Sequence, residues 1–193
     1  MNISIFKRIA TAYITIGKSF GLWLSPIITG FLLLILRIIV FIFMKIDYIL
    51  FPKLFFKKIK KPIVIVGNPR SGTTFLHRYL SKNKLGTGSQ LWKLLYPSLT
   101  LQKLIYPFLP LLEKISPTKH HSTVAHKTNL QSIETDDASI LFRFFDGFFL
   151  YGFILCWHDE DLFDWVDPKM RNNSKRDFKW LKAIWKRTLI SEK

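Results

Sequence analysis

A glycine loop between an apolar run and an amphipathic helix is the feature that most limits the folds open to this chain. Residues 62–66, Pro-Ile-Val-Ile-Val, form a short β-branched run typical of a buried parallel strand. Residues 67–72, Gly-Asn-Pro-Arg-Ser-Gly, follow as a loop. The next segment, residues 73–82, repeats apolar side chains at helical spacing, at Phe75, Leu76, Tyr79 and Leu80. Strand, glycine loop and helix in this order predict a nucleotide-binding βα unit.

The composition of the loop indicates a phosphate site. Gly67 and Gly72 allow backbone N–H groups to turn inward, and the start of the following helix adds unpaired donors and a positive dipole end. Residues 67–74 have the length of a Walker A loop, but Thr73 stands at the lysine position and the cation is Arg70, inside the loop. A kinase or ATPase needs that lysine on the β- and γ-phosphates, so a P-loop kinase is disfavoured. Arg70 and the neighbouring hydroxyls favour a compact 5′-phosphate that carries a sulfuryl group, with no metal required.

Residues 62–80 resemble the 5′-phosphosulfate loop of the sulfotransferases that use 3′-phosphoadenosine 5′-phosphosulfate (PAPS), in particular the bacterial-type branch with Gly-x-Pro-Arg-Ser-Gly-Thr-Thr. The resemblance covers roughly residues 62–190 and implies an α/β, P-loop-NTPase-like fold, a parallel sheet with flanking helices, with PAPS as co-substrate. Residues 132–137, Ser-Ile-Glu-Thr-Asp-Asp, resemble the family's acidic patch more loosely. By position, the residues that would hold the 5′-phosphosulfate are Arg70, Ser71, Gly72, Thr73 and Thr74.

Sulfuryl transfer to a hydroxyl is an in-line displacement that needs a base and cations around the reacting oxygens. Arg70 is the candidate cation. The family uses a histidine or a glutamate as the base, which leaves His126 and Glu134 as candidates. Glu134 is favoured because it stands in the acidic patch at the start of a predicted helix, although a solvated carboxylate stabilised by the helix dipole is the alternative. No metal is expected, because His120 and His121 have no partner at ligand spacing.

Residues 22–44 predict a membrane helix. Sixteen of these 23 residues are Leu, Ile, Val or Phe, and roughly 20 residues are enough to cross a bilayer core. Their insertion free energy, about −0.3 to −0.6 kcal/mol each, outweighs the roughly +3 kcal/mol of Arg37, which has to snorkel or face a polar partner. We expect a spanning helix. An in-plane or re-entrant anchor and a buried soluble helix are the alternatives.

The positive charge of the chain is concentrated in its first part. The net charge is +16, and residues 1–112 hold 16 Lys and Arg but one acidic residue, Asp47. Six lysines follow the apolar run, which predicts a cytoplasmic location for the rest of the chain and suits anionic lipid. Nucleic acid is not an expected partner, because no nucleic-acid-binding motif accompanies the charge. The six are Lys45, Lys53, Lys57, Lys58, Lys60 and Lys61.

These observations predict two regions: a membrane-anchor helix with a basic linker at residues 1–61, and the N-terminal part of a sulfotransferase domain at residues 62–193. Residues after the loop have mainly helical patterns, including an amphipathic one over residues 178–190, so we expect a sheet that is incomplete within this chain. The predicted function is transfer of a sulfuryl group from PAPS to a hydroxyl of a lipid, glycan or small molecule. The alternative is a non-catalytic membrane protein whose degenerate P-loop only binds an anion.

Overall fold

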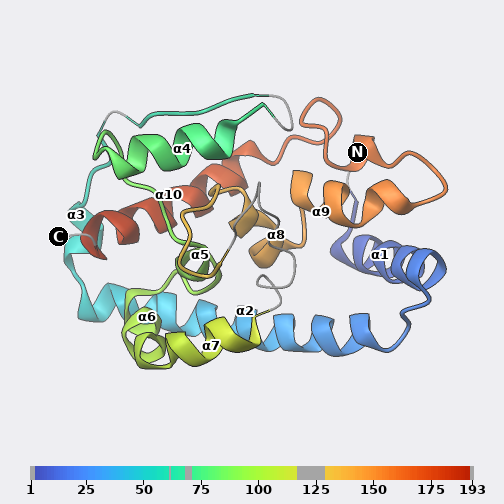
Figure 1. Ribbon diagram of the computed structural model, residues 1–193, viewed down its shortest axis with the longest axis horizontal. Helices are drawn as coiled ribbons and strands as arrows, with labels where there is room; N and C mark the ends of the chain where they lie inside the picture. Colours follow the sequence, from blue (N-terminus) through green and yellow to red (C-terminus); the bar gives the residue numbers. More distant parts are fainter. Residues whose placement is uncertain (1–2, 61, 68–70, 117–128, 192–193) are drawn as a thin grey trace. The chain divides into compact units, whose positions relative to one another are not determined.

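A computed structural model describes residues 3–60, 62–67, 71–116 and 129–191, and these residues form helices joined by turns (Figure 1). Within these ranges the only β pairing is one antiparallel bridge between Gln90 and Ile133. The chain divides into two compact units. Unit 1 comprises residues 1–39 and 137–181, and unit 2 comprises residues 40–136 and 182–193. Each unit draws on both sides of the predicted boundary at residues 61 and 62, which stays a prediction.

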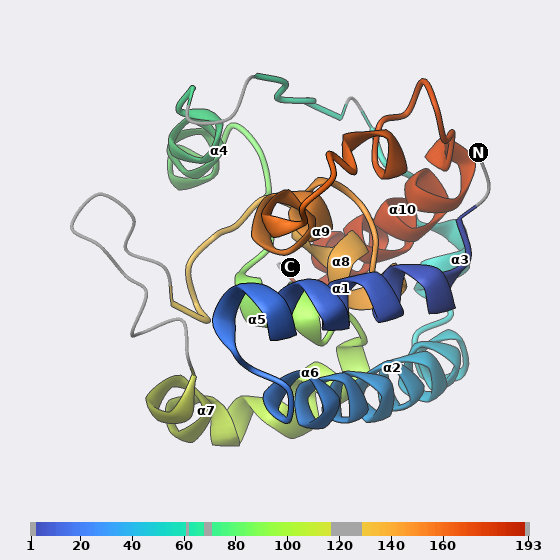
Figure 2. The same ribbon diagram turned by 90° about the vertical axis from the view of Figure 1, so that its right-hand side faces the viewer.

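Unit 1 is built around a small apolar core. Leu150, Leu155, Leu162 and Trp165 are buried together with Ile3 near the N-terminus. Within this unit α1 lies between the first half of α2 and α9 (Figures 1 and 2). The helices of unit 1 are α1 (Ile5–Phe20), the first half of α2 (Ser25–Leu50), α8 (Ala138–Phe144), α9 (Phe148–Phe153), η3 (Leu155–Trp157), η4 (Phe163–Trp165) and the first part of α10 (Ser174–Ser191).

Helix α1 has sequence-encoded ends. The Ser4 Oγ accepts a hydrogen bond from the backbone N–H of Lys7 at 3.2 Å, which caps the start. Gly21 has φ +66° and donates its N–H to the carbonyl of Gly17 at 2.9 Å, which closes the end in the left-handed conformation. The short turn that follows leads into α2, so both ends of α1 are set by local signals.

Unit 2 packs short helices around the second half of α2 and the end of α10. Its buried side chains include Leu54, Leu91, Trp92, Leu94 and Ile184. The helices that lie wholly in this unit are α3 (Lys53–Phe56), α4 (Thr73–Lys82), α5 (Leu91–Leu95), α6 (Leu99–Ile105), η1 (Tyr106–Phe108) and α7 (Leu109–Ile115).

The structure confirms the helices predicted from the sequence but not the predicted strand. The amphipathic helices predicted over residues 73–82 and 178–190 are confirmed as α4 and α10. The predicted strand at residues 62–66 is not formed, and the described residues contain no parallel sheet. Val64 and Val66 are 73% and 87% exposed. A strand requires a neighbour to pair its backbone groups, and no described segment pairs with this run.

Candidate functional site

The described part of the glycine loop closes tightly in front of α4. A Cβ placed on Gly67 would lie 2.6 Å from Ser71 Oγ and 2.8 Å from Thr73 Cγ2, so a larger residue would force these side chains to move. Gly72 has φ +84° and caps α4, which begins at Thr73. Residues 68–70 lie outside the described residues, and so does the candidate cation Arg70. The two glycines therefore bring the hydroxyl residues to the start of the helix, where its unpaired N–H groups lie.

Helix α4 keeps its apolar side chains exposed. Phe75 and Tyr79 are 74% and 53% exposed, and their rings stack with centroids 6.4 Å apart. The face that the periodicity predicts as buried is therefore open in the described structure. The same absence of a neighbouring sheet that leaves residues 62–66 exposed explains this, since the helix of a βα unit packs on that sheet.

The polar side of α4 holds Glu134 through an ion pair with Arg78. Arg78 Nη2 donates to Glu134 Oε1, and Arg78 Nε donates to the carbonyl of Ile133 at 2.9 Å. The backbone N–H of Glu134 donates to the carbonyl of Ser89 at 3.1 Å. Both side chains are partly buried. The carboxylate thus lies beside Arg78, five residues and roughly 7.5 Å along the axis from the start of α4.

This arrangement corrects the predicted surroundings of Glu134. Helix α8 begins at Ala138, so Glu134 lies in the irregular segment before it and not at a helix start. Its carboxylate is paired with a guanidinium, whereas the alternative expectation placed it in solvent. Sequence reasoning missed Arg78, because the two residues are 56 positions apart and no local pattern joins them.

The remaining candidates are the second possible base, His126, and the other residues of the acidic patch. His126 lies outside the described residues. In the acidic patch, Asp136 accepts a hydrogen bond from Trp185 Nε1 at 2.8 Å, which ties the patch to α10 within unit 2. Asp137 precedes α8 without a side-chain capping bond. No group of three His, Cys, Asp or Glu that could hold a metal occurs among the residues with a described position.

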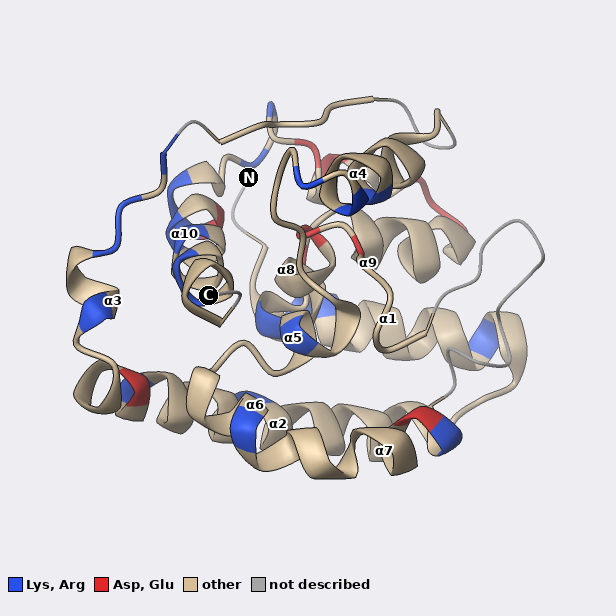
Figure 3. Cartoon of the chain, turned by 60° about the vertical axis from the view of Figure 1, so that its left-hand side comes forward, with Lys and Arg blue, Asp and Glu red and all other residues tan. Residues whose placement is uncertain are grey.

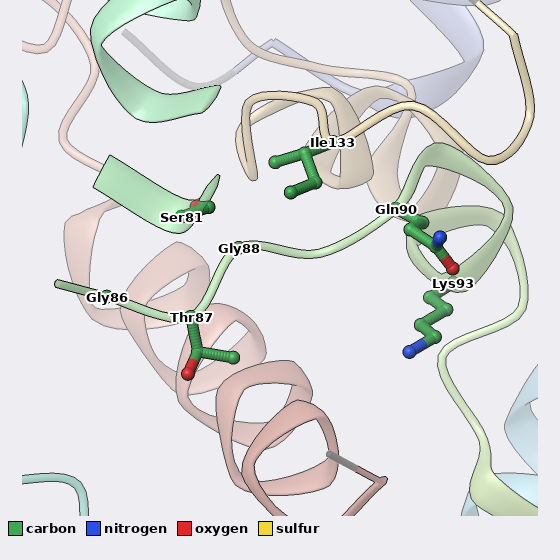
Figure 4. A pocket seen from close by; sticks show the side chains of 7 residues that line it. All are labelled: Ser81, Gly86, Thr87, Gly88, Gln90, Lys93 and Ile133. Carbon is green, nitrogen blue, oxygen red and sulfur yellow. The ribbon is translucent and has the colours of Figure 1, made fainter. Parts of the chain in front are cut away.

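A small cavity lies at the opposite end of α4 from the loop (Figure 4). Its volume is about 150 Å³, and Ser81, Thr87 and Lys93 give it polar walls. Ile133, next to Glu134, also lines it. Ser81 is eight residues beyond Thr73, roughly 12 Å along the helix, so the cavity is separate from the glycine loop.

Basic residues gather on one side of unit 2. Figure 3 shows Lys and Arg along α3, the segment after it and the end of α10. Lys186 Nζ donates to the carbonyl of Leu54 at 3.1 Å, which joins α10 to α3. This side of unit 2 offers positive charge to an anionic partner.

The comparisons with known proteins give one match. The model of the sulfotransferase family matches residues 62–176, which is more than half of the chain and includes the glycine loop, α4 and Glu134. No curated protein and no solved structure matches the chain significantly.

Proposed function

The chain belongs to the sulfotransferase family, and from that premise we propose that it moves a sulfuryl group from PAPS to a hydroxyl acceptor on a lipid, glycan or small molecule. The observation that carries the proposal is the glycine loop inside the matched region, where Gly67, Ser71 and Thr73 approach closely at the start of α4. Backbone donors, hydroxyls and the helix dipole then face a single bound anion.

The proposed roles follow from the charges of the reaction. Arg70, Ser71, Gly72, Thr73 and Thr74 would hold the 5′-phosphosulfate. The acceptor oxygen forms a bond to sulfur while the bond from sulfur to the 5′-phosphate oxygen breaks, and 3′-phosphoadenosine 5′-phosphate leaves. Positive charge and N–H donors stabilise the negative charge that grows on the leaving phosphate.

The acceptor proton needs a base, and Glu134 remains the first candidate, with His126 as the second. Arg78 would orient the Glu134 carboxylate from α4. The same ion pair favours a second candidate function: a non-catalytic membrane protein whose loop binds an anion while Glu134 only joins two segments. We propose a cytoplasmic location for the catalytic residues, supported by the lysines that follow α2.

Calorimetry and a sulfate-transfer assay on the full chain test this function. We expect 3′-phosphoadenosine 5′-phosphate to bind more tightly than ATP and without Mg²⁺. Arg70→Ala removes a charge-assisted contact worth about 1.5–3 kcal/mol, so binding should weaken by roughly ten- to a hundredfold. Lys175→Ala, exposed on α10, is the matched control and should leave binding unchanged.

A second pair of variants separates catalysis from binding alone. Glu134→Gln should keep nucleotide affinity and lower turnover by a factor on the order of 10², as expected for a general base. Glu160→Gln is the control at an exposed carboxylate. Unchanged turnover in Glu134→Gln would move the base to His126. Nucleotide binding with no transfer to any hydroxyl acceptor would favour the non-catalytic alternative. Mg²⁺-dependent ATP binding that is insensitive to Arg70→Ala would exclude the sulfotransferase function.

A further inference from the structure

We propose that α2 lies in the plane of a membrane surface, with its exposed apolar face on an anionic bilayer and both of its flanks on the same side. Helix α2 is the one helix among the described residues that is long and apolar enough to span a membrane. Its length permits a crossing, but the contacts on either side of it do not. The inference does not depend on the sulfotransferase chemistry.

The first argument is topological and concerns unit 1 alone. Helix α1 precedes α2, yet it binds residues that follow α2. Arg8, 4% exposed, donates from Nε to the carbonyl of Phe145 at 3.0 Å and from Nη2 to that of Phe144 at 3.3 Å. Ser19 Oγ donates to the carbonyl of Trp157 at 3.1 Å. A single crossing by α2 would place the two partners of each contact on opposite sides of the bilayer.

The second argument concerns Arg37, in the middle of α2. Its Nε donates to the carbonyl of Phe142 at 2.7 Å, and its Nη2 to that of Leu141 at 3.3 Å. These carbonyls belong to the last turn of α8, where a cation interacts favourably with the carbonyl end of the helix. Residues 25–36 precede Arg37 and span only about 18 Å, short of the roughly 30 Å of a hydrocarbon core. The helix cannot cross while Arg37 stays bound to α8.

The two sides of α2 differ in what they contact. Val40 and Asp47 are buried, at 5% and 0% exposure, and Arg37 is half-buried on the same side. The other side is a continuous row of exposed apolar residues, and a contiguous apolar patch of this kind marks an interaction surface. This outer face of α2 consists of Ile27, Ile28, Phe31, Leu32, Leu34, Ile35, Ile38, Ile39, Phe41 and Ile42.

Charge and aromatic placement identify the occupant as a bilayer with anionic head groups. Trp23 is 49% exposed just before α2, where an aromatic ring suits the interface. Exposed lysines follow the outer face, and lysines near an anionic surface strengthen binding to it. A helix with one apolar side, one protein-bound side and basic flanks is typical of in-plane binding. The lysines are Lys45, Lys53, Lys58 and Lys60.

Topology is tested with single cysteines in the full chain. Cys156→Ser gives a cysteine-free background, since the chain has one cysteine. Ala10→Cys in α1 and Lys179→Cys in α10 are both exposed and stand before and after α2. In membrane vesicles of one orientation, a membrane-impermeant maleimide should react with both to the same extent before detergent is added. Reaction of one site only after detergent would overturn the proposal.

Depth is tested along the outer face. Ile28→Cys, Ile35→Cys and Ile42→Cys are seven residues apart on one side of the helix and carry an environment-sensitive fluorophore. Quenching by lipids spin-labelled at different depths should place all three probes at the same shallow level. A probe at Ile35 near the bilayer centre, with shallower neighbours, would mean a spanning helix. Lys169→Cys, exposed in unit 1, is the control that should stay open to aqueous iodide.

The lipid is tested by flotation with vesicles of defined composition. The chain should bind vesicles of phosphatidylcholine and phosphatidylglycerol at least tenfold more tightly than vesicles of phosphatidylcholine alone. Equal binding would remove the anionic part of the proposal. If the chain floats with neither kind of vesicle and forms a dimer in solution, a second copy covers the outer face instead.

Discussion

At the scale of single residues, the two most deeply buried carboxylates, Asp146 and Asp47, are each held by cationic and polar partners. Asp146, 2% exposed in unit 1, accepts hydrogen bonds from Arg171 Nη1 at 2.7 Å and Arg176 Nη1 at 2.8 Å. Arg8 lies 3.8 Å from the same carboxylate. Burial would raise the pKa of Asp146, but the hydrogen bonds from Arg171 and Arg176 and the charge of Arg8 outweigh it. The pKa is therefore lowered from its ordinary value.

A lowered pKa makes the contribution of Asp146 dependent on pH. Because the folded pKa lies below the unfolded value of about 3.9, the stabilisation is present above that value and is lost as the pH falls through the folded pKa. Asp146→Asn should lower the free energy of unfolding by about 3–5 kcal/mol at pH 7, since it leaves buried guanidinium groups uncompensated. Urea unfolding in one buffer series should show that the difference in the free energy of unfolding between variant and wild type becomes smaller below about pH 4. A gap independent of pH would contradict the ion-pair explanation.

Unit 2 also contains a buried ion pair, formed by Asp47 and Arg187. Arg187 Nε donates to Asp47 Oδ2 at 2.7 Å, and both side chains are almost fully buried. The carboxylate also accepts the backbone N–H groups of Leu99 and Thr100, at 3.1 and 2.9 Å, so Asp47 caps α6 from α2. Arg187 Nη2 donates to the carbonyl of Met44 at 2.9 Å.

A double-mutant cycle tests the coupling in this pair. Asp47→Asn and Arg187→Met should each cost about 3–5 kcal/mol, because each leaves its partner buried and unpaired. The double variant should cost clearly less than the sum of the two single losses. Additive losses, measured by urea unfolding, would mean that the two residues act independently. Lys179→Met, exposed on the same helix, should be close to neutral.

At the scale of elements, the glycine loop and α4 form the element that the sequence describes best. Gly72 combines φ +84° with the position just before the helix. Its nearest surroundings are open, so the backbone conformation and not a steric clash requires glycine. A side chain in this conformation costs roughly 1–2 kcal/mol.

Gly72→Ala should therefore weaken nucleotide binding by roughly tenfold while the global fold persists. The strained residue lies in the loop that binds the anion. When the loop relaxes to relieve this strain, its N–H donors move away from the ligand. Gly86→Ala is the matched control. Its added Cβ also meets open space, but Gly86 does not have the positive φ that Gly72 has. Calorimetry with 3′-phosphoadenosine 5′-phosphate measures both, and equal affinities would refute a need for the left-handed backbone.

At the scale of the whole molecule, positive charge and exposed apolar surface occur together. The net charge is +16, and the lysines after α2 follow directly on its outer face. Screening shortens the reach of such charges from about 10 Å at 0.1 M salt to about 3 Å at 1 M. Apolar burial is insensitive to this screening. The two contributions to membrane binding can therefore be separated by ionic strength.

Binding to anionic vesicles should weaken by about two to three orders of magnitude between 0.1 and 1 M salt and then level off. The charge contribution, about 1 kcal/mol per lysine near the surface, is what salt removes. Replacing Lys45, Lys53, Lys58 and Lys60 by Gln should lower the affinity at low salt to the value at which wild-type binding levels off at high salt. Flotation across a salt series measures this, and complete release at 1 M salt would show that the apolar face does not enter the bilayer.

Local sequence patterns are enough to predict several of the elements that the structure forms. The spacing of apolar residues predicts α4 and α10, and the glycines predict the turn before α4, because these signals act between residues three or four positions apart. Apolar composition alone predicts a membrane helix over residues 22–44, and residues 25–50 form α2.

Which polar groups meet, and whether a run of residues has a neighbour, depends on tertiary packing. Arg78 and Glu134 are 56 positions apart, and Arg37 meets carbonyls more than 100 positions away. No periodicity encodes such pairs, because they follow from how whole helices pack. The run at residues 62–66 has strand composition but stays unpaired, since backbone pairing depends on a partner that local sequence cannot specify. The same packing holds Arg37 against α8 and so distinguishes a helix beside a membrane from one that crosses it.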